Sequence, residues 1–320
     1  MPRSIGQLLV EDGARLAAAL ALDANSARFE VQYLLQQVLG KPRAWLLAHS
    51  EESLTPERQA NYDTLLQRRT QGEPIAYILG YREFYGLNFK VTPATLIPRP
   101  ETELLVEQAL QRIPSPPVPD ETTSHSTKPA SGQVAGYLPR AGEGGRQAGR
   151  GYEFSTLDLG TGSGAIALSI AHTRPDAEVV AVDASAEALE VARGNAERLN
   201  ISNATFAHSD WYAALGQQRF NLIVSNPPYV AAGDAHLQQG DLRFEPTSAL
   251  VSGADGLDDV RRIVEGAPSH LKPGGWLLLE HGYDQAAQVR ELLDSAGMTE
   301  IFSARDFSGI ERVSGGRCMG

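Results

Sequence analysis

Cysteine and long apolar runs are scarce in this sequence, and each scarcity excludes a class of protein. Cys318 is the single cysteine of the 320 residues, which excludes an internal disulfide and a cysteine-cluster metal site. This composition fits a reducing compartment, so we expect a cytoplasmic protein. No stretch of 18 apolar residues occurs, so no membrane-spanning helix is predicted. The mixed polar and apolar start lacks the apolar core of a secretory signal, and we expect no such signal.

Positive charge is also in short supply. The chain has 28 Lys and Arg against 39 Asp and Glu, a net charge of −11, and residues 153–320 account for this excess with 12 basic and 23 acidic side chains. Such an acidic half is poorly suited to gripping a phosphate backbone, so we expect no direct contact with nucleic acid. Net charge does not exclude a local basic patch in the folded protein. The length and the 42% hydrophobic content predict a globular protein of about two domains.

Residues 1–80 are predicted to form a small helical bundle. Apolar residues recur at helical spacing after Asp23, and Thr55 followed by Pro56 is a typical helix start. Gly13 interrupts the apolar pattern of the first helix. Two roles are open for the bundle: it packs on its own core, or it forms a domain that docks a substrate.

Residues 81–112 differ in character and link this bundle to the rest of the chain. Apolar residues interspersed with Gly86 and Pro93 predict a hairpin, followed by a helix through Leu110. In residues 113–152, glycine, proline, serine and threonine fill 20 of the 40 positions, and the few large apolar residues show no period. Such a segment buries too little to offset its ordering entropy, so we predict a flexible insert.

Residues 153–320 are predicted to form an α/β domain, because strand and helix patterns alternate along them. The predicted strands are 155–159, 178–182, 220–225 and 276–280, with short ones near 299–304 and 311–318. The predicted helices are 165–172, 184–199, 258–270 and 284–296. This alternation indicates a three-layer fold around a largely parallel sheet.

A glycine-rich turn follows the first strand of this domain and opens its first helix. Its glycines alternate strictly after Asp158, which distinguishes it from the dinucleotide pattern G-x-G-x-x-G. Glycines at such a place allow a sharp turn and a close approach of backbone to ligand. A carboxylate beside the turn suits a ligand with a cationic group better than a pyrophosphate, although some glycine-rich turns bind nothing. The candidate binding residues are Gly160, Thr161, Gly162, Ser163 and Gly164.

Two more acids and a tryptophan are expected at the ends of the next two strands. Asp183 can accept hydrogen bonds from both ribose hydroxyls of an adenosine ligand, and its alternative role is a helix cap. Trp211 can lie against an adenine face, with core packing as the alternative. Asp210 can accept a hydrogen bond from the exocyclic amine of that adenine. With the glycine turn present, we favour ribose binding for Asp183.

The sharpest motif is Asn226-Pro227-Pro228-Tyr229, directly after a buried strand. Pro227 biases Asn226 away from helix, and the prolines leave carbonyls without competing local N–H donors. The side-chain carbonyl of Asn226 and the backbone carbonyl of Pro227 can each accept one N–H of a planar –NH2 group. The alternative is a rigid loop with no ligand.

Clamping a planar –NH2 group has a chemical purpose. An amide nitrogen is a poor nucleophile because its lone pair is delocalised into its own carbonyl. Hydrogen bonds to both hydrogens help the nitrogen to pyramidalise; each contributes about 0.5–1.5 kcal/mol, and orientation supplies about 7–11 kcal/mol in good cases. No strong base is then required, and we do not assign His281 as one.

In their order along the chain, these motifs resemble those of the class I S-adenosylmethionine-dependent methyltransferases. The resemblance implies a three-layer sandwich with a mainly parallel seven-stranded sheet, beside the N-terminal helical bundle. It also implies S-adenosylmethionine as the cofactor. The Asn-Pro-Pro-Tyr motif marks members that methylate planar nitrogens, in nucleobases and in glutamine amides, and it does not choose between them.

The flanking sequence is similar to the peptide chain release factor glutamine N5-methyltransferases. The similar segments are 72–80, 83–86, 97–103, Phe244-Glu245-Pro246, Asp255-Gly256-Leu257 and Glu280-His281-Gly282. This similarity implies that the substrate is the glutamine in the Gly-Gly-Gln motif of class 1 release factors, and that residues 1–80 help to dock the release factor. The sequence gives no reason to expect a metal. The insert at 113–152 departs from the family.

The resemblance also implies roles for individual residues. The catalytic residues are Asn226, Pro227 and Tyr229. The cofactor is held by Gly160, Thr161, Gly162, Ser163, Gly164, Asp183, Asp210, Trp211 and Asn226. The substrate glutamine is held by Asn226, Pro227, Pro228 and Tyr229. Arg99 and Glu101 either contact the substrate or form a structural pair where the linker meets the catalytic domain.

Three alternatives differ in class or substrate. A ribosomal protein glutamine methyltransferase is disfavoured by the residues 97–103. A nucleic-acid adenine methyltransferase must flip a base and bind phosphates, and the sequence shows neither a target-recognition domain nor a basic catalytic half. A non-catalytic adaptor for release factors is disfavoured by the intact motifs. The sequence is silent on oligomeric state, and we expect a monomer.

Overall fold

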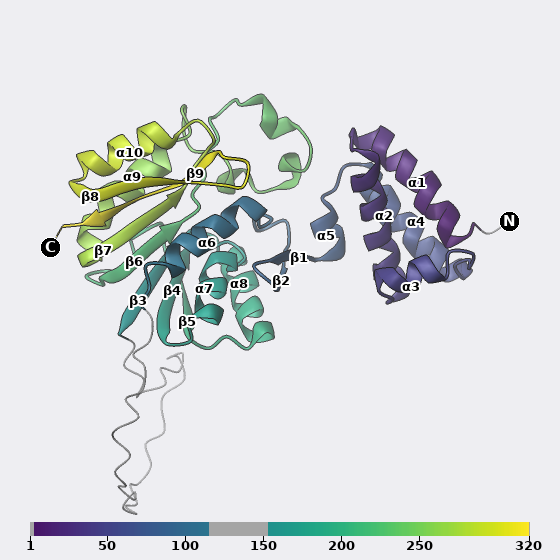
Figure 1. The fold of residues 1–320 in the computed structure, drawn as a ribbon, viewed down its shortest axis with the longest axis horizontal. Coiled ribbons are helices and arrows are strands. Elements are labelled where there is room, and N and C mark those ends of the chain that lie inside the picture. Colours follow the sequence, from purple (N-terminus) through teal and green to yellow (C-terminus); the bar gives the residue numbers. More distant parts are fainter. Residues whose placement is uncertain (1–2, 115–152, 320) are drawn as a thin grey trace, which may run out of the picture.

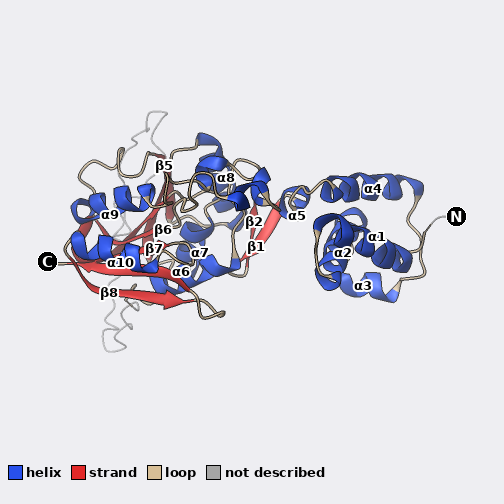
Figure 2. Cartoon of the chain, turned by 90° about the horizontal axis from the view of Figure 1, so that it is seen from above, coloured by secondary structure: helices blue, strands red, loops and turns tan. Residues whose placement is uncertain are grey.

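The computed structural model describes residues 3–114 and 153–319. The predicted insert at 113–152 lies outside the described residues from position 115 onward. The described chain forms a helical bundle, a short linker and an α/β body, in that order (Figure 1). Viewed from above, the bundle lies at one end of the molecule and the sheet at the other, with the linker between them (Figure 2).

The bundle is built from amphipathic helices whose ends follow the local sequence. Its helices are α1 (Ile5–Leu20), α2 (Ala24–Leu39), α3 (Arg43–Ala48), α4 (Pro56–Thr70) and α5 (Ile75–Leu79). Asp23 caps α2, and Thr55 caps α4. Helix α1 runs through Gly13, where an added Cβ would lie 3.7 Å from the Cα of Arg28 on α2. An added Cβ would thus make ordinary contact with α2, and the glycine does not end the helix.

The linker is a hairpin followed by one helix. Strands β1 (Tyr81–Phe84) and β2 (Leu87–Lys90) pair antiparallel around a two-residue turn, Tyr85-Gly86, in which both residues have positive φ. The single-turn helix η1 (Pro100–Thr102) leads into α6 (Glu103–Leu110). The backbone of Lys90 exchanges hydrogen bonds of 2.7 and 3.0 Å with the side chain of Asn195. This contact fixes the hairpin on the α/β body.

The α/β body contains a seven-stranded sheet with the order β5-β4-β3-β6-β7-β9-β8. Its strands are β3 (Phe154–Leu159), β4 (Ala177–Asp183), β5 (Ala204–His208), β6 (Phe220–Ser225), β7 (Leu271–Glu280), β8 (Met298–Arg305) and β9 (Glu311–Cys318). The pairs from β5 across to β7 are parallel, whereas β9 is antiparallel to both β7 and β8. The predicted fold class, a mainly parallel seven-stranded sheet beside a helical bundle, is confirmed.

Helices cover both faces of this sheet. They are α6, α7 (Ala165–Thr173), α8 (Ala186–Leu199), α9 (Asp258–His270) and α10 (Ala286–Ser295). Leu222 and Val224 of β6 pack in one core with α6 and α7, while Ile223 between them packs in another core with α9 and α10. The sheet is therefore the middle layer of three. Short helical turns η2 (Ala235–Gln238), η3 (Leu242–Phe244) and η4 (Thr247–Ala249) lie in the loop after β6.

One predicted strand boundary is wrong. The third strand along the α/β body is β5, and it ends at His208. Asp210 and Trp211, which we expected at the end of this strand, therefore lie beyond it. The Ser209 hydroxyl donates to the carbonyl of Trp211 at 2.7 Å and accepts from the N–H of Ala214 at 3.0 Å, which turns the chain sharply. No helix in the described part of the chain is long and apolar enough to cross a membrane.

Candidate active site

A cavity of about 590 Å³ lies at the carboxyl ends of the parallel strands. This is the edge where open α/β sheets place their ligands. Most of the residues predicted from the sequence line it: Gly160, Thr161, Gly162, Ser163, Asp183, Asp210, Trp211, Asn226 and Pro228. A smaller cavity of about 120 Å³ adjoins it, and Asn226 and Arg99 line both. Tyr229 lines the smaller cavity, and neither cavity is lined by Gly164 or Pro227.

Asp183 braces the glycine turn. Its Oδ2 accepts from the backbone N–H of Gly162 at 2.8 Å, and its Oδ1 accepts from the N–H of Ser185 at 2.8 Å. Helix α8 is capped by the hydroxyl of Ser185 and not by Asp183. Because each carboxylate oxygen has two lone pairs, Asp183 retains acceptor capacity toward the cavity.

The glycines of the turn share a positive φ, and two of them differ in what surrounds them. All three have positive φ, at 72° for Gly160, 55° for Gly162 and 83° for Gly164. A Cβ on Gly162 would meet nothing within 4 Å, so this residue leaves open space at the cavity wall. A Cβ on Gly164 would lie 3.0 Å from Cδ1 of Leu168. Gly164 thus serves the packing of α7, whereas Gly162 belongs to the cavity.

Asp158 lies beneath the turn and does not line the cavity. Its Oδ2 accepts from the Thr161 hydroxyl at 2.6 Å and from the N–H of Ala167 at 3.2 Å, while Oδ1 has no partner among the described residues. Burial raises the pKa of this carboxyl to about 7. The carboxylate therefore holds the turn and the start of α7 together from below.

Trp211 connects the cavity to the core. Its backbone is left-handed, with φ of 48°, and its ring packs against the core formed with α9 while it also lines the cavity. Its indole N–H donates to Asp259 at 3.2 Å. Asp210 accepts from Arg262 at 2.8 Å, and both of these side chains are largely exposed. The two interpretations of Trp211 are therefore compatible, since one ring performs both packing and lining.

Asn226 follows β6 and is held by the linker. Its Nδ2 donates to the hydroxyl of Thr102 at 3.2 Å. Its Oδ1 is shielded from solvent and has no hydrogen-bond partner among the described residues. An unpaired buried acceptor costs about 1–3 kcal/mol, so a donor supplied by a ligand would be stabilised there.

The linker is anchored to the loop after β6 by one buried carboxylate. Glu245 accepts from the backbone N–H of Ile97 at 3.0 Å and from the guanidinium of Arg99. Burial raises the pKa of Glu245, and the charge of Arg99 opposes this shift. The structural partner of Arg99 is therefore Glu245 and not Glu101.

Glu280 and His281 belong to a segment that is similar to the family, and their surroundings differ. Both ring nitrogens of His281 are engaged, one with the carbonyl of Gly282 at 2.9 Å and one with the hydroxyl of Ser314 at 2.8 Å. Burial lowers the pKa of His281. Glu280 is buried at the end of β7, beside the end of β6. Its Oε2 has no hydrogen-bond partner in the described chain, and burial raises its pKa to about 7.

Several lining or supporting residues were not predicted as site residues. They are Thr102, Asp259, Arg262 and Glu280. Glu245 was named only as part of a segment similar to the family, with no role in the site. Thr102 and Glu280 lie in segments that are similar to the family, and this similarity was the signal that could have identified them. Asp259 and Arg262 are three residues apart on α9, a spacing that places them on one face of the helix. In the described ranges, no group of three or more His, Cys, Asp and Glu side chains is arranged to hold a metal ion.

Two family models match this chain. The model described as the PrmC N-terminal domain matches residues 14–80, and the model described as the methyltransferase small domain matches residues 150–244. The first covers helices of the bundle, and the second covers the glycine turn, Asp183 and Asn226. The helical bundle and the α/β body, the two lobes of this chain, therefore match separate family models.

Curated relatives match nearly the whole chain. A release factor glutamine methyltransferase from Bordetella pertussis is 49% identical over 298 residues, which is 93% of this chain and 97% of the relative. The enzyme of that name from Xylella fastidiosa is 44% identical over 95% of this chain and 98% of the relative. The one from Escherichia coli is 43% identical over 92% and 93%. The chain thus belongs to the release factor glutamine methyltransferase family.

Proposed function

We propose that this enzyme transfers a methyl group from S-adenosylmethionine to the side-chain amide nitrogen of the glutamine in the Gly-Gly-Gln motif of class 1 release factors. The methylated release factor then acts in translation termination, and we place this activity in the cytoplasm. The larger cavity would take the cofactor, and the smaller cavity would take the glutamine side chain. The enzyme would act as a monomer, without a metal.

The observation that carries this proposal is the unpaired Oδ1 of Asn226, on a residue shared by both cavities. A glutamine amide presents two N–H donors, and Oδ1 is an acceptor for one of them. The backbone carbonyl of Pro227 is our candidate for the other, because proline at position 228 supplies no N–H to compete for it. Tyr229 would pack beside the substrate chain from the wall of the smaller cavity.

The residues around the larger cavity suit an adenosine-containing cofactor with a charged amino acid part. Asp183 has spare acceptors for ribose hydroxyls, Trp211 offers an aromatic face, and Gly162 leaves room for a ligand against the backbone. Bound in this way, the cofactor supplies an electrophilic methyl group. Asp210 would accept a hydrogen bond from the adenine amine. Its ion pair with Arg262 is exposed to solvent, so weakening this pair would cost little free energy.

In the reaction, a bond forms between the methyl carbon and the glutamine nitrogen as the bond from that carbon to sulfur breaks. The nitrogen then loses one proton to solvent, and the amide is restored as a secondary amide. The work of this chain is to hold the nitrogen in line and to accept its N–H bonds, so no strong base is needed. His281 is engaged on both sides and takes no part.

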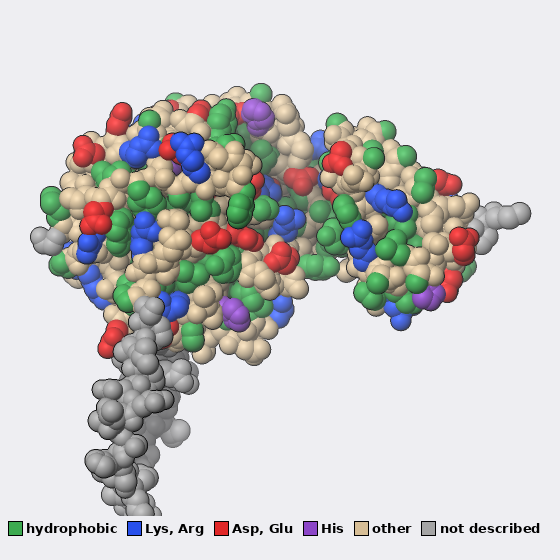
Figure 3. All heavy atoms as spheres, in the orientation of Figure 1, with side chains coloured by type: hydrophobic (Ala, Val, Ile, Leu, Met, Phe, Trp, Pro, Cys, Tyr) green, Lys and Arg blue, Asp and Glu red, His purple; other side chains and the backbone are tan. Residues whose placement is uncertain are grey.

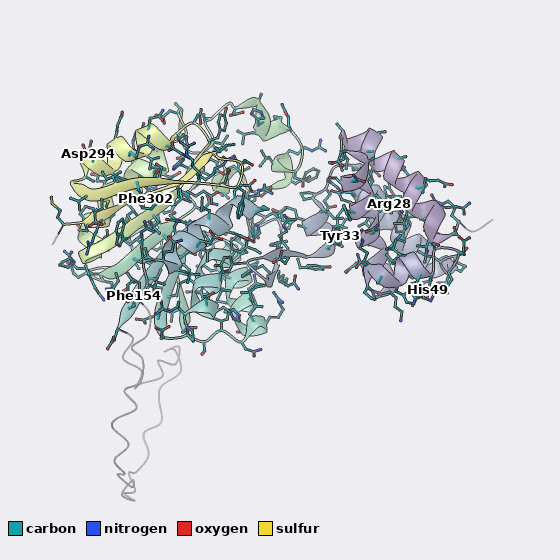
Figure 4. The ribbon with its side chains drawn as sticks, viewed as in Figure 1. Arg28, Tyr33, His49, Phe154, Asp294 and Phe302 are labelled. Atoms are coloured by element: carbon teal, nitrogen blue, oxygen red, sulfur yellow. The ribbon has the colours of Figure 1, made fainter. Side chains whose placement is uncertain are left out.

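We place the release factor between the two lobes. Tyr33 is 49% exposed and lies on the side of the helical bundle that is turned toward the α/β body (Figure 4). The arginines that line the cavities are paired with carboxylates, Arg99 with Glu245 and Arg262 with Asp210. Acidic and basic side chains are interspersed on the face drawn in Figure 3. These features support a protein substrate over a nucleic acid, whose phosphates attract unpaired basic side chains.

The test uses the full-length enzyme, S-adenosylmethionine with a labelled methyl group and a purified class 1 release factor. The product is digested, and mass spectrometry locates the label. We expect the label on the glutamine of the Gly-Gly-Gln motif, and its loss with Asn226→Ala while this variant keeps the fold. Label on ribosomal protein or on DNA, with none on the release factor, would refute the proposal.

A further inference from the structure

Thr102 and Glu280 lie next to Asn226 and have no role of their own in the proposed reaction. Thr102 is buried at the junction of η1 and α6, and Glu280 is buried at the last position of β7. The parallel pairing of β6 with β7 aligns Ser225 with Leu279, which brings the next residue of each strand side by side. Thus Asn226 and Glu280 are neighbours, and the linker adds Thr102 to them.

One hydrogen bond and the proximity of Glu280 connect the three side chains. Nδ2 of Asn226 donates to the Thr102 hydroxyl at 3.2 Å. Glu280 lies beside both groups, and the Thr102 hydroxyl and the Asn226 amide hold the pKa of its buried carboxyl below the value that burial alone would give. A hydroxyl has one proton and two lone pairs. If that proton is given to the carboxylate, the lone pairs remain for the amide of Asn226.

We propose that Thr102 and Glu280 are positioning residues for Asn226: the Glu280 carboxylate fixes the proton of the Thr102 hydroxyl, and this hydroxyl fixes the Asn226 amide with Oδ1 left free for the substrate. The inference rests on the proposed function, because it takes Oδ1 as the acceptor of a glutamine N–H. It explains why the segment 97–103 belongs to the site although its arginine is engaged elsewhere.

The charge of Glu280 determines the direction of this chain of hydrogen bonds. An ionised carboxylate accepts only, so Thr102 must donate to it. A protonated carboxyl can donate to Thr102, whose own proton then turns toward Asn226 and favours the flipped amide. In the flipped amide, Nδ2 replaces Oδ1 at the substrate position and opposes the N–H donors of glutamine. Only the ionised state of Glu280 therefore supports turnover.

Other charged groups surround Glu280 and contribute to its ionisation. Arg312 of β9 favours the carboxylate, whereas Glu101 of η1 disfavours it. Burial raises the pKa of the nearby Tyr229 phenol, and the charge of Glu280 adds to this effect. Because burial raises the pKa of Glu280 to about 7, its ionisation changes within the working range of an enzyme.

The first test compares Thr102→Val with Thr102→Ser. Valine keeps the shape and removes the hydroxyl, so kcat should fall about 10- to 100-fold, while serine should keep kcat within about threefold of the parent. Cofactor affinity by calorimetry should not change in either. Thr156→Val is the matched control, because the Thr156 hydroxyl is buried in β3 without a partner among the described residues. Parental kcat in a folded Thr102→Val enzyme would overturn the proposal.

The second test is the pH profile of kcat. The parent should lose turnover as the pH falls through about 7, and Glu280→Gln should lack this dependence, since glutamine does not titrate there. A role in packing alone would leave the profile unmoved. The same dependence in parent and Glu280→Gln would contradict the proposal.

A third readout does not depend on activity. In the full-length protein labelled with 15N-asparagine, the side-chain signals of Asn226 are identified by their absence from Asn226→Ala. These signals should shift with a midpoint at about pH 7 in the parent and stay constant in Glu280→Gln. Constant signals in the parent would reject the coupling even if the release factor proves to be a substrate. If the signals titrate but no release factor is methylated, the proposed function fails and the coupling stands.

Discussion

The carboxylate of Asp183 and the backbone of Gly162 are joined by a hydrogen bond of 2.8 Å, which ties the end of β4 to the glycine turn after β3. Both oxygens of this carboxylate accept from backbone N–H groups, since Ser185 supplies the second donor. No side chain of the described protein competes for its remaining lone pairs by hydrogen bond. One side chain thus supports the turn and keeps acceptors for ribose hydroxyls.

Removing this carboxylate should weaken cofactor binding. Hydrogen bonds to charged groups contribute about 1.5–3 kcal/mol each, so Asp183→Ala should raise the dissociation constant of S-adenosylmethionine at least about tenfold. Asp183→Asn, which keeps one acceptor oxygen, should lose less. Isothermal titration calorimetry measures both variants. An unchanged dissociation constant for Asp183→Ala would exclude the ribose role.

Two glycines of the turn should respond differently to the same substitution. Both have positive φ, so alanine costs about 1–2 kcal/mol of stability at either position. Gly164→Ala also brings a Cβ to 3.0 Å from Leu168, so its melting temperature should fall further than that of Gly162→Ala. Gly162→Ala adds a methyl group at the cavity wall and should weaken cofactor binding more. Calorimetry and thermal unfolding of the pair decide this, and equal behaviour would show that the cavity does not use Gly162.

Local signals in the sequence predict most of the architecture and the motif positions. Strict glycine alternation and the Asn226-Pro227 dipeptide are readable because each acts through its own backbone conformation. The strands of the sheet are readable because buried parallel strands are short apolar runs. The end of β5 was predicted wrongly because the side chain of Ser209 turns the chain there. A turn made by a serine hydroxyl leaves no mark in the pattern of apolar residues.

The supporting residues of the site could not be predicted in the same way. Glu245 contacts Arg99 across 146 positions, and Thr102 contacts Asn226 across 124. Such partners are set by the register of β6 on β7 and by the path of the linker, neither of which a single sequence specifies. For Glu280 the sequence showed a motif, and the structure adds the burial that gives the carboxyl its raised pKa.

Arg69 should stabilise the helical bundle more than it stabilises the contact between the bundle and the α/β body. This side chain is buried at the end of α4, donates to Glu30 at 2.7 and 3.0 Å, and reaches Asp241 of the α/β body at 3.1 Å. Arg69→Met leaves Glu30 without its partner, and breaking a buried pair costs about 3–5 kcal/mol. Asp241→Ala removes the more exposed contact and should cost under about 1 kcal/mol. Chemical denaturation measures the free energy of unfolding of both variants. Equal losses would show that the Arg69 hydrogen bonds stabilise the protein mainly through the contact between the lobes.

The dependence of stability on pH should reveal the buried carboxyl of Asp158. Its pKa is about 7 in the folded protein, against a usual value of 3.8, so between about pH 4 and pH 7 the folded state binds more protons than the unfolded state. The free energy of unfolding contributed by this group therefore falls as the pH rises through that window. Asp158→Asn cannot titrate, so its stability relative to the parent should rise between pH 5 and pH 8 by up to a few kcal/mol.

Asp255→Asn is the control for this measurement, because hydrogen bonds from Arg261 hold the pKa of the exposed Asp255 at about 2. The stability that Asp255 contributes is lost only below about pH 4, as the pH falls toward this pKa. Its difference from the parent should therefore be constant between pH 5 and pH 8. Urea denaturation at several pH values gives both curves. A flat difference for Asp158→Asn as well would show that this carboxyl is ionised throughout the range and that a group yet to be identified compensates its charge beneath the glycine turn.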